Sequence, residues 1–192
     1  MRDRRLAFFL ALVILCYTSF AAYNSFFSLY LQGLGAGTRI VGVATAIATL
    51  SELPGMLLAG MAIRRFGTKP VLLAGMGSCF VRWVAYALIH DYRVALVFQI
   101  LHGVSFAAFY VGGVTFVDTI VPSRLRSTGQ TLFNVAFFGL GAVIGSNLFG
   151  LLYDRLGGAG IFVVAAAIAA PTLLGLLLFV PNLRATDADS AD

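Results

Sequence analysis

The sequence predicts an all-α, polytopic membrane protein with six transmembrane helices. Hydrophobic residues make up 60% of the chain and charged residues only 11%, whereas an ordinary soluble domain has roughly 25% charged residues. Six apolar stretches reach the roughly 20 residues needed to cross a hydrocarbon core of about 30 Å. They cover residues 6–31, 40–63, 71–89, 94–117, 132–152 and 161–180. We therefore expect one six-helix domain over residues 1–183 and a short polar tail, 184–192, that is disordered.

The first stretch follows Met1–Arg5, an opening that also suits a secretory signal peptide. Its apolar run continues to Leu31, well beyond the roughly 7–15 residues of a signal core, which favours a membrane span. Cys16 and Cys79 both fall within spans, so they indicate neither a disulfide framework nor a metal site, and we expect no cofactor. The net charge of +5 does not indicate a nucleic-acid partner, because membrane orientation explains the basic loops.

Positive charge is distributed unevenly between the loops, which orients the bundle in a bilayer. With the N-terminus inside, the cytoplasmic side carries Arg2, Arg4, Arg5, Arg64, Arg65, Lys69, Arg124, Arg126 and Arg184, and the outer side carries Arg39, Arg93 and Arg155. We therefore expect a multi-pass protein of the plasma or inner membrane with both termini in the cytoplasm.

Two loops that lie 90 residues apart share the pattern G-x-x-x-[RD]-R-x-G. The first contains Gly60, Arg64, Arg65 and Gly67, and the second covers residues 150–157. The first glycine lets helices approach closely, and the last permits a tight turn. A single copy has a plainer explanation, since any short loop between spans collects glycine and arginine. Two copies separated by three spans lie on opposite membrane faces, as in the 3+3 inverted repeats of many secondary transporters.

The segment AGMAIRRFGTKP resembles the signature loop of the major facilitator superfamily, G-x-x-x-D-R-x-G-R-[RK]. The segments YNSFFSLYLQGLG, LSELPGMLLAG and LHGVSFAAFYVGGVTFVDTIVPSRLRSTGQTL resemble helices seven, eight, and ten to eleven of its sugar-permease-like and nucleoside–proton-symporter-like branch. The resemblance covers nearly the whole chain, but only the C-terminal six-helix half of that fold. Arg64 stands where the signature has its acidic residue, so we do not carry the gating role of that residue over to this chain.

Three ionisable residues, Glu52, Arg82 and His102, lie on successive spans. A rise of about 1.5 Å per residue places them roughly 18, 10 and 12 Å from the outer ends of their helices, within one slab about 8 Å thick. Each would cost about 2.5–3.5 kcal/mol facing lipid, so such residues normally face a cavity and pair with one another. Two purely structural explanations remain open: an ion pair between Glu52 and Arg82 that fixes the helix register, and a core histidine at position 102.

The resemblance implies roles for these three residues. In proton-coupled sugar permeases of this branch, an acidic residue on helix eight, an arginine on helix nine and a histidine on helix ten serve substrate binding and proton transfer. A second carboxylate follows the histidine by three residues there, where this chain has Ser105. Glu52 is the favoured proton carrier, because its protonation depends on burial and nearby charge, which a substrate can change. Pro54 beside it predicts a bent span, although prolines are common in membrane helices.

Stripes of polar and aromatic residues at helical spacing mark further spans. Aromatic stripes more often pack than bind, so the cavity candidates are those side chains that can form hydrogen bonds. They are Tyr23 and Asn24 on the first span, Gln99 and Tyr110 on the fourth, and Gln130 and Asn134 on the fifth. Gly141 and Gly145 form a GxxxG packing motif. We expect Asp118 to join Arg124 and Arg126 in an interfacial charge cluster.

These features predict the C-terminal half of a secondary active transporter, which moves a small polar or organic solute with protons by alternating access. The chain has no HExxH, GxSxG or Walker motif, so we do not expect an enzyme. A non-transporting scaffold or sensor derived from a transporter half is the alternative. We do not expect an isolated monomer to transport: the partner is a second copy, or a complementary six-helix half. A fragment of a longer chain is favoured, because the resemblance starts at the seventh helix.

Overall fold

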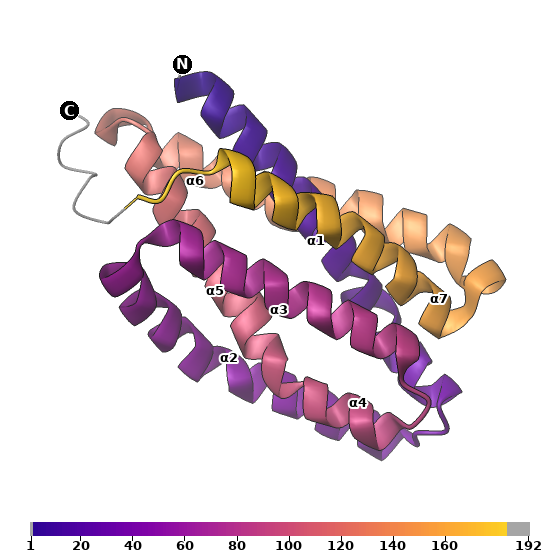
Figure 1. The fold of residues 1–192 in the computed structure, drawn as a ribbon. Coiled ribbons are helices and arrows are strands. Elements are labelled where there is room, and N and C mark those ends of the chain that lie inside the picture. Colours follow the sequence, from indigo (N-terminus) through magenta and orange to yellow (C-terminus); the bar gives the residue numbers. More distant parts are fainter. Residues whose placement is uncertain (1, 184–192) are drawn as a thin grey trace.

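The computed structural model describes residues 2–183, and within them the chain is helical with no strand. The tail expected at 184–192 lies outside the described residues. The elements are α1 (Arg2–Gly33), α2 (Thr38–Phe66), α3 (Thr68–Leu88), α4 (Tyr92–Phe98), α5 (Ile100–Ile120), the short 3₁₀ turn η1 (Ser123–Leu125), α6 (Arg126–Asn134), the π-helix η2 (Val135–Gly141) and α7 (Ala142–Phe179). The all-α class is confirmed, and Figure 1 shows the helices arranged as one bundle.

Five helical stretches of the described chain, where six were predicted, are long and apolar enough to cross a membrane. The fifth stretch, Ser123–Phe179, has 57 residues, whereas about 20 residues cross a bilayer core. It contains a break at Gly157, where the backbone leaves the helical region. Figure 1 shows the chain turning back near the end of the bundle within this stretch, so that its two arms run in opposite directions. The sixth predicted span is therefore the second arm of α7.

The two loops of the internal repeat have the same backbone conformation. Gly67 has φ 89° and ψ 177°, and Gly157 has φ 67° and ψ −179°. A positive φ with ψ near 180° is a region that only glycine adopts readily. The second loop therefore repeats the conformation of the first, 90 residues later. Figure 1 places the two turns at opposite ends of the bundle, which agrees with an inverted repeat.

The repeat also appears in how the helices pack. Gly55 and Gly145 are 90 residues apart, and each lies where its helix approaches a neighbour closely. A Cβ atom at Gly55 would lie 2.6 Å from the Gly103 carbonyl oxygen of α5, and one at Gly145 would lie 2.6 Å from the Thr18 carbonyl oxygen of α1. Because small residues permit such approach, the predicted role of the GxxxG motif that ends at Gly145 is confirmed.

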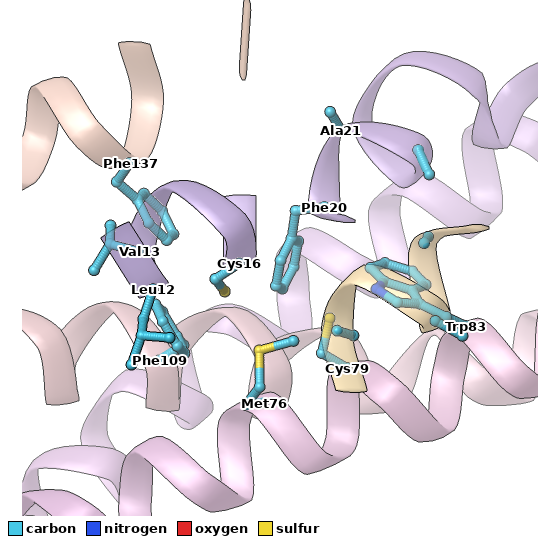
Figure 2. Packing of buried hydrophobic residues seen from close by; sticks show 14 of the residues in the cluster. Leu12, Val13, Cys16, Phe20, Ala21, Met76, Cys79, Trp83, Phe109 and Phe137 are labelled. Atoms are coloured by element: carbon cyan, nitrogen blue, oxygen red, sulfur yellow. The ribbon is translucent and has the colours of Figure 1, made fainter. Parts of the chain in front are cut away.

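Helix α1 runs through the centre of the apolar core. Figure 2 shows its Leu12, Cys16 and Phe20 between side chains of α3 and residues of the later helices, among them Phe137 of η2. The indole of Trp83 in α3 meets the Phe20 ring edge to face, with ring centroids 5.5 Å apart. This core fixes α1 and α3, which carry two of the side chains at the polar site described next.

Candidate functional site

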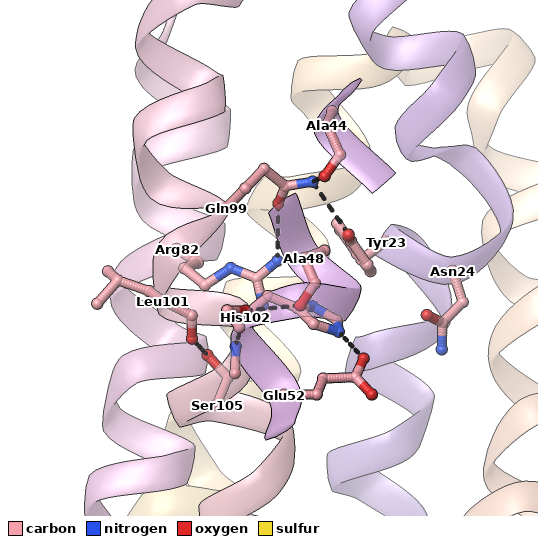
Figure 3. A network of polar contacts seen from close by, with 12 residues as sticks. Tyr23, Asn24, Ala44, Ala48, Glu52, Arg82, Gln99, Leu101, His102 and Ser105 are labelled. Atoms are coloured by element: carbon pink, nitrogen blue, oxygen red, sulfur yellow. Dashed lines mark hydrogen bonds and ion pairs between the residues drawn. The ribbon is translucent and has the colours of Figure 1, made fainter. Parts of the chain in front are cut away.

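The site is built around a tight crossing of α2 and α5. Gly103 has no side chain, and a Cβ atom there would overlap the Ser51 carbonyl oxygen. The Gly103 backbone N–H donates to Ser51 Oγ at 2.9 Å. The residues next to this crossing are Glu52 and His102, and the carboxylate Oε1 lies 3.0 Å from imidazole Nε2. Close backbone approach therefore brings two ionisable side chains together (Figure 3).

This contact differs from the pairing considered in the sequence analysis. Within the described residues, the side-chain contact of Glu52 is with His102, and Arg82 forms no ion pair with a carboxylate. The side chain of His102 is 7% exposed and that of Glu52 is 28% exposed. The carboxylate therefore lies towards an open side of the bundle, while the imidazole lies inside. A core histidine with no ionisable partner is not what the structure shows.

Arg82 is fully buried in a cage of aromatic rings. Its guanidinium carbon lies 4.7 Å from the ring centroid of Tyr23, 5.0 Å from that of Trp83 and 5.6 Å from that of Tyr86. Cation–π contacts of this kind stabilise a cation that has lost its water. Among the described residues, Nε and Nη1 have no hydrogen-bond partner. Arg82 thus keeps two nitrogen atoms, with three N–H groups between them, that its neighbours leave unused.

The side-chain amide of Gln99 connects Arg82 and its tyrosine neighbours by hydrogen bonds. Its Oε1 accepts hydrogen bonds from Tyr86 Oη at 2.8 Å and from Arg82 Nη2 at 3.3 Å. Its Nε2 donates to Tyr23 Oη at 3.0 Å and to the Ala44 carbonyl at 3.3 Å. Figure 3 shows the amide lying between α1, α2 and α3. All four hydrogen-bonding positions of this buried amide are therefore satisfied by groups from three other helices.

The fourth span is interrupted at this residue. Gln99 separates α4 from α5, its N–H donates to Leu96 O at 3.1 Å, and the His102 N–H donates to Gln99 O at 2.9 Å. These are bonds over three residues, as in a 3₁₀ turn. By contrast, α2 continues through the exposed Pro54 as one helix. The helix assignment is therefore interrupted in the fourth span and continuous in the second, and the bend that Pro54 predicts in the second span stays a prediction.

A second polar group lies further along α5. Tyr110 Oη lies 3.4 Å from Asn134 Oδ1, and Gln130 Nε2 donates to Asp118 Oδ1 at 2.7 Å. No ion pair joins Asp118 to Arg124 or Arg126 in the described part of the chain, so their charge cluster stays a prediction. The hydrogen-bond partner of the Asp118 carboxylate is the Gln130 amide instead. Three rings that follow one another along α5 at intervals of about one helical turn are stacked: His102 on Phe106, and Phe106 on Tyr110. This row of rings connects the two polar groups.

Two of the expected residues lie apart from the network. Asn24 is exposed, and its amide donates to Tyr17 Oη at 3.1 Å; Figure 3 shows it separated from Glu52 and His102. Ser105, which stands where the resemblance has a carboxylate, donates to Ser78 Oγ at 3.1 Å and so binds α5 to α3. Asn24 therefore lies on the open surface of the bundle, and Ser105 holds α5 against α3.

The signature loop is held by the segment that follows the last helix. Asn182 Nδ2 donates to the Phe66 carbonyl at 3.0 Å, and the Lys69 N–H donates to Asn182 Oδ1 at 3.2 Å. The Thr68 N–H donates to the Leu183 carbonyl at 2.8 Å. We call Asn182–Leu183 the clasp. It supplies acceptors for the first N–H groups of α3, which Gly67 has no side chain to provide.

The glycine and arginine positions of this loop behave differently from one another. Gly67 is buried beneath Asn182, so its missing side chain is required by both space and backbone conformation. Arg64 and Arg65 are exposed. Gly60, predicted to allow close helix approach, has no atom of the described residues within 4 Å of a Cβ position. That part of the prediction is wrong, because the close approach of α2 occurs at Gly55 instead.

Comparison with known proteins decides the family, since the family model described as "MFS_1 like family" matches residues 1–164. The chain belongs to the MFS_1-like family. It is also similar to the uncharacterized transporter YwbF of Bacillus subtilis (strain 168), with 29% identity over 172 residues, which are 88% of this chain and 41% of that protein. The maltose permease of Geobacillus stearothermophilus is 27% identical over 184 residues, which are 96% of this chain and 47% of the permease.

A crystal structure of a mutant of the nucleoside transporter NupG shares the fold of this MFS_1-like chain. The TM-score is 0.82 at 17% sequence identity, and the match covers 93% of this chain and 49% of that one. The chain thus spans less than half the length of each of these three proteins. All three are transporters by name, which supports the expectation of a multi-pass membrane protein that is not an enzyme.

Sequence reasoning missed several residues of the site in this MFS_1-like chain. Tyr86 follows Arg82 by four residues, so helical spacing places both on one face of α3, and this signal was available. Trp83 could also have been singled out, because it is the one tryptophan of the chain. Ser51 carried no such signal, because its role depends on the close approach of Gly103, fifty-two residues away.

Proposed function

We propose that this chain forms one half of a secondary active transporter, and that Glu52, Arg82 and His102 serve solute binding and proton transfer. The observation that carries the proposal is the contact of 3.0 Å between Glu52 Oε1 and His102 Nε2 inside membrane-spanning helices. Ionisable residues at such depth mark proton relays and substrate pathways. Histidine also changes its charge near physiological pH more readily than other side chains.

The solute we propose is small and polar, such as a sugar or a nucleoside. Arg82 Nε and Nη1 and His102 Nδ1 are buried atoms without a hydrogen-bond partner among the described residues. Buried polar atoms of this kind are rare in proteins and need an explanation. Solute hydroxyl or carboxylate oxygens would accept hydrogen bonds from these two arginine nitrogens. Tyr23, Gln99, Tyr110, Gln130 and Asn134 would then line or support the same cavity, with Asn24 at its edge.

A partner covers the open side of the site in this proposal. Glu52 is part-exposed and Asn24 is exposed on helices long and apolar enough to cross a membrane. The chain also spans less than half of the maltose permease, which is similar to it. We propose that a complementary six-helix half, or a second copy of this chain, closes the cavity and rocks against it. The count of basic loop residues supports an orientation with both termini in the cytoplasm.

A ligand screen by thermal unfolding of the purified chain in detergent tests solute binding. A ligand at about 100 times its Kd stabilises the folded state by about 2.7 kcal/mol. We expect a sugar or nucleoside to raise the unfolding midpoint, and Arg82→Gln to abolish the rise. Ser25→Ala, a change on α1 outside the network, should leave the rise intact. An equal rise in Arg82→Gln would contradict the assigned site.

Reconstitution into liposomes, with crosslinking to count subunits, tests the need for a partner. We expect no solute uptake by the chain when crosslinking shows a monomer. Uptake by a dimer would identify the second copy as the partner. Uptake by a demonstrated monomer would refute the half-transporter proposal.

A further inference from the structure

A cavity of about 210 Å³ lies at the arginine-rich end of the bundle, away from the polar site. Its walls come from three helices that are distant in sequence. Among them are Arg4, Arg5 and Phe8 of α1, Phe116 of α5, Phe179 of α7 and Val180 after it. One side of the cavity is therefore cationic, and the other is formed by three aromatic rings.

The two arginines of this cavity are not used elsewhere in the described chain. Both are exposed, and neither pairs with a carboxylate among the side chains that the structure describes. Phe8 and Phe179 are 41% and 66% exposed, and their rings meet edge to face with centroids 5.3 Å apart. Cations and apolar rings thus adjoin at the level where the helices end, which is where a bilayer places its headgroups.

We propose that this cavity binds one anionic phospholipid, with the phosphate on Arg4 and Arg5 and the glycerol backbone and first methylene groups on Phe8, Phe116 and Phe179. The planar guanidinium matches the geometry of phosphate oxygens and binds them in pairs. Basic pockets between membrane helices on the cytoplasmic side bind anionic headgroups. The aromatic wall adds apolar contact that a small soluble anion would not fill.

The cavity distinguishes these two arginines from others on the same face of the membrane. Arg64 and Arg65 are also exposed at the arginine-rich end but do not line the cavity. If surface charge alone attracted lipid, the two pairs would contribute equally. A bound lipid at the cavity instead predicts that only Arg4 and Arg5 discriminate between headgroups.

Native mass spectrometry of the purified chain with phosphatidylglycerol and phosphatidylcholine tests the proposal. We expect the chain to retain one phosphatidylglycerol in preference to phosphatidylcholine. Arg4→Gln/Arg5→Gln should weaken phosphatidylglycerol binding by about 10- to 30-fold, given the usual contribution of each cation near an anionic surface. The matched control, Arg64→Gln/Arg65→Gln, removes the same charge and should leave binding nearly unchanged. Equal unfolding midpoints of the two variants in phosphatidylcholine would show that both are folded.

Three results would overturn the proposal. The first is equal loss of binding in both double variants, which indicates general surface attraction. The second is full competition by inorganic phosphate at millimolar concentration, which indicates a site for a free anion. The third is binding only in a variant that ends at Arg184, because the carboxylates of Asp187, Asp189 and Asp192 would then be the occupants of the cavity in the intact chain.

Discussion

Glu52 of α2 and His102 of α5 are in contact because their neighbours, Ser51 and Gly103, let the two backbones cross without an intervening side chain. The acidic residue therefore pairs with the imidazole, while Arg82 lies within its aromatic cage. This division assigns separate tasks to the three groups. Under the proposed function, the pair would hold or release a proton, and the arginine would hold a solute.

A double-mutant cycle should detect the pair. We expect Glu52→Gln and His102→Gln to be coupled by about 0.5–3 kcal/mol in unfolding free energy, as is usual for residues in contact. The comparison cycle, Glu52→Gln with Arg82→Gln, should be additive within about 0.5 kcal/mol. Chemical unfolding in detergent micelles measures both cycles. Strong coupling in the arginine cycle alone would restore the pairing of Glu52 with Arg82.

The crossing itself predicts the effect of a single methyl group. Gly103→Ala places a Cβ atom on the Ser51 carbonyl, so α2 and α5 must separate. Such overpacking typically costs about 1–3 kcal/mol, and thermal unfolding should show a lower midpoint. Gly77→Ala is the matched control, since no described atom lies within 4 Å of its Cβ position. An unchanged midpoint in Gly103→Ala would show that the crossing is not close.

The clasp predicts a local change in hydrogen exchange. Asn182→Ala removes the acceptor of the Lys69 N–H and the donor to the Phe66 carbonyl. Net losses of about 0.5–1.5 kcal/mol per hydrogen bond are typical, so amide exchange at the start of α3 should become faster. Asn147→Ala, whose amide bonds only within its own helix, should leave that exchange unchanged. Faster exchange in both variants would mean a general loss of stability instead.

The sequence allowed the spans, the repeat and the helices of the site to be predicted, because each depends on local pattern. Apolar length predicts a span, and the shared loop pattern predicted that Gly67 and Gly157 make the same turn. The break between α4 and α5 could not be predicted, since Gln99 is neither proline nor glycine. It accompanies hydrogen bonds to groups of three other helices, which only the folded bundle brings together.

The partner of Glu52 could not be predicted for a related reason. Depth along a helix follows from residue counting, and it correctly placed Glu52, Arg82 and His102 in one layer. Rotation of each helix about its axis decides which two of the three meet. That rotation depends on the packing of Gly55 and Gly103, and their close approach is a property of the folded pair.

The proposed role of Glu52 in proton coupling is tested most directly by transport measurements on the Glu52→Gln variant, in a transporter assembled from this chain and its proposed partner. We expect uphill accumulation driven by a proton gradient to be abolished, while counterflow exchange of solute without a gradient is largely retained. Asp118→Asn, which removes a carboxylate from the second polar group, should keep both activities. Equal loss of accumulation and exchange in Glu52→Gln would contradict a proton-carrying role for this residue.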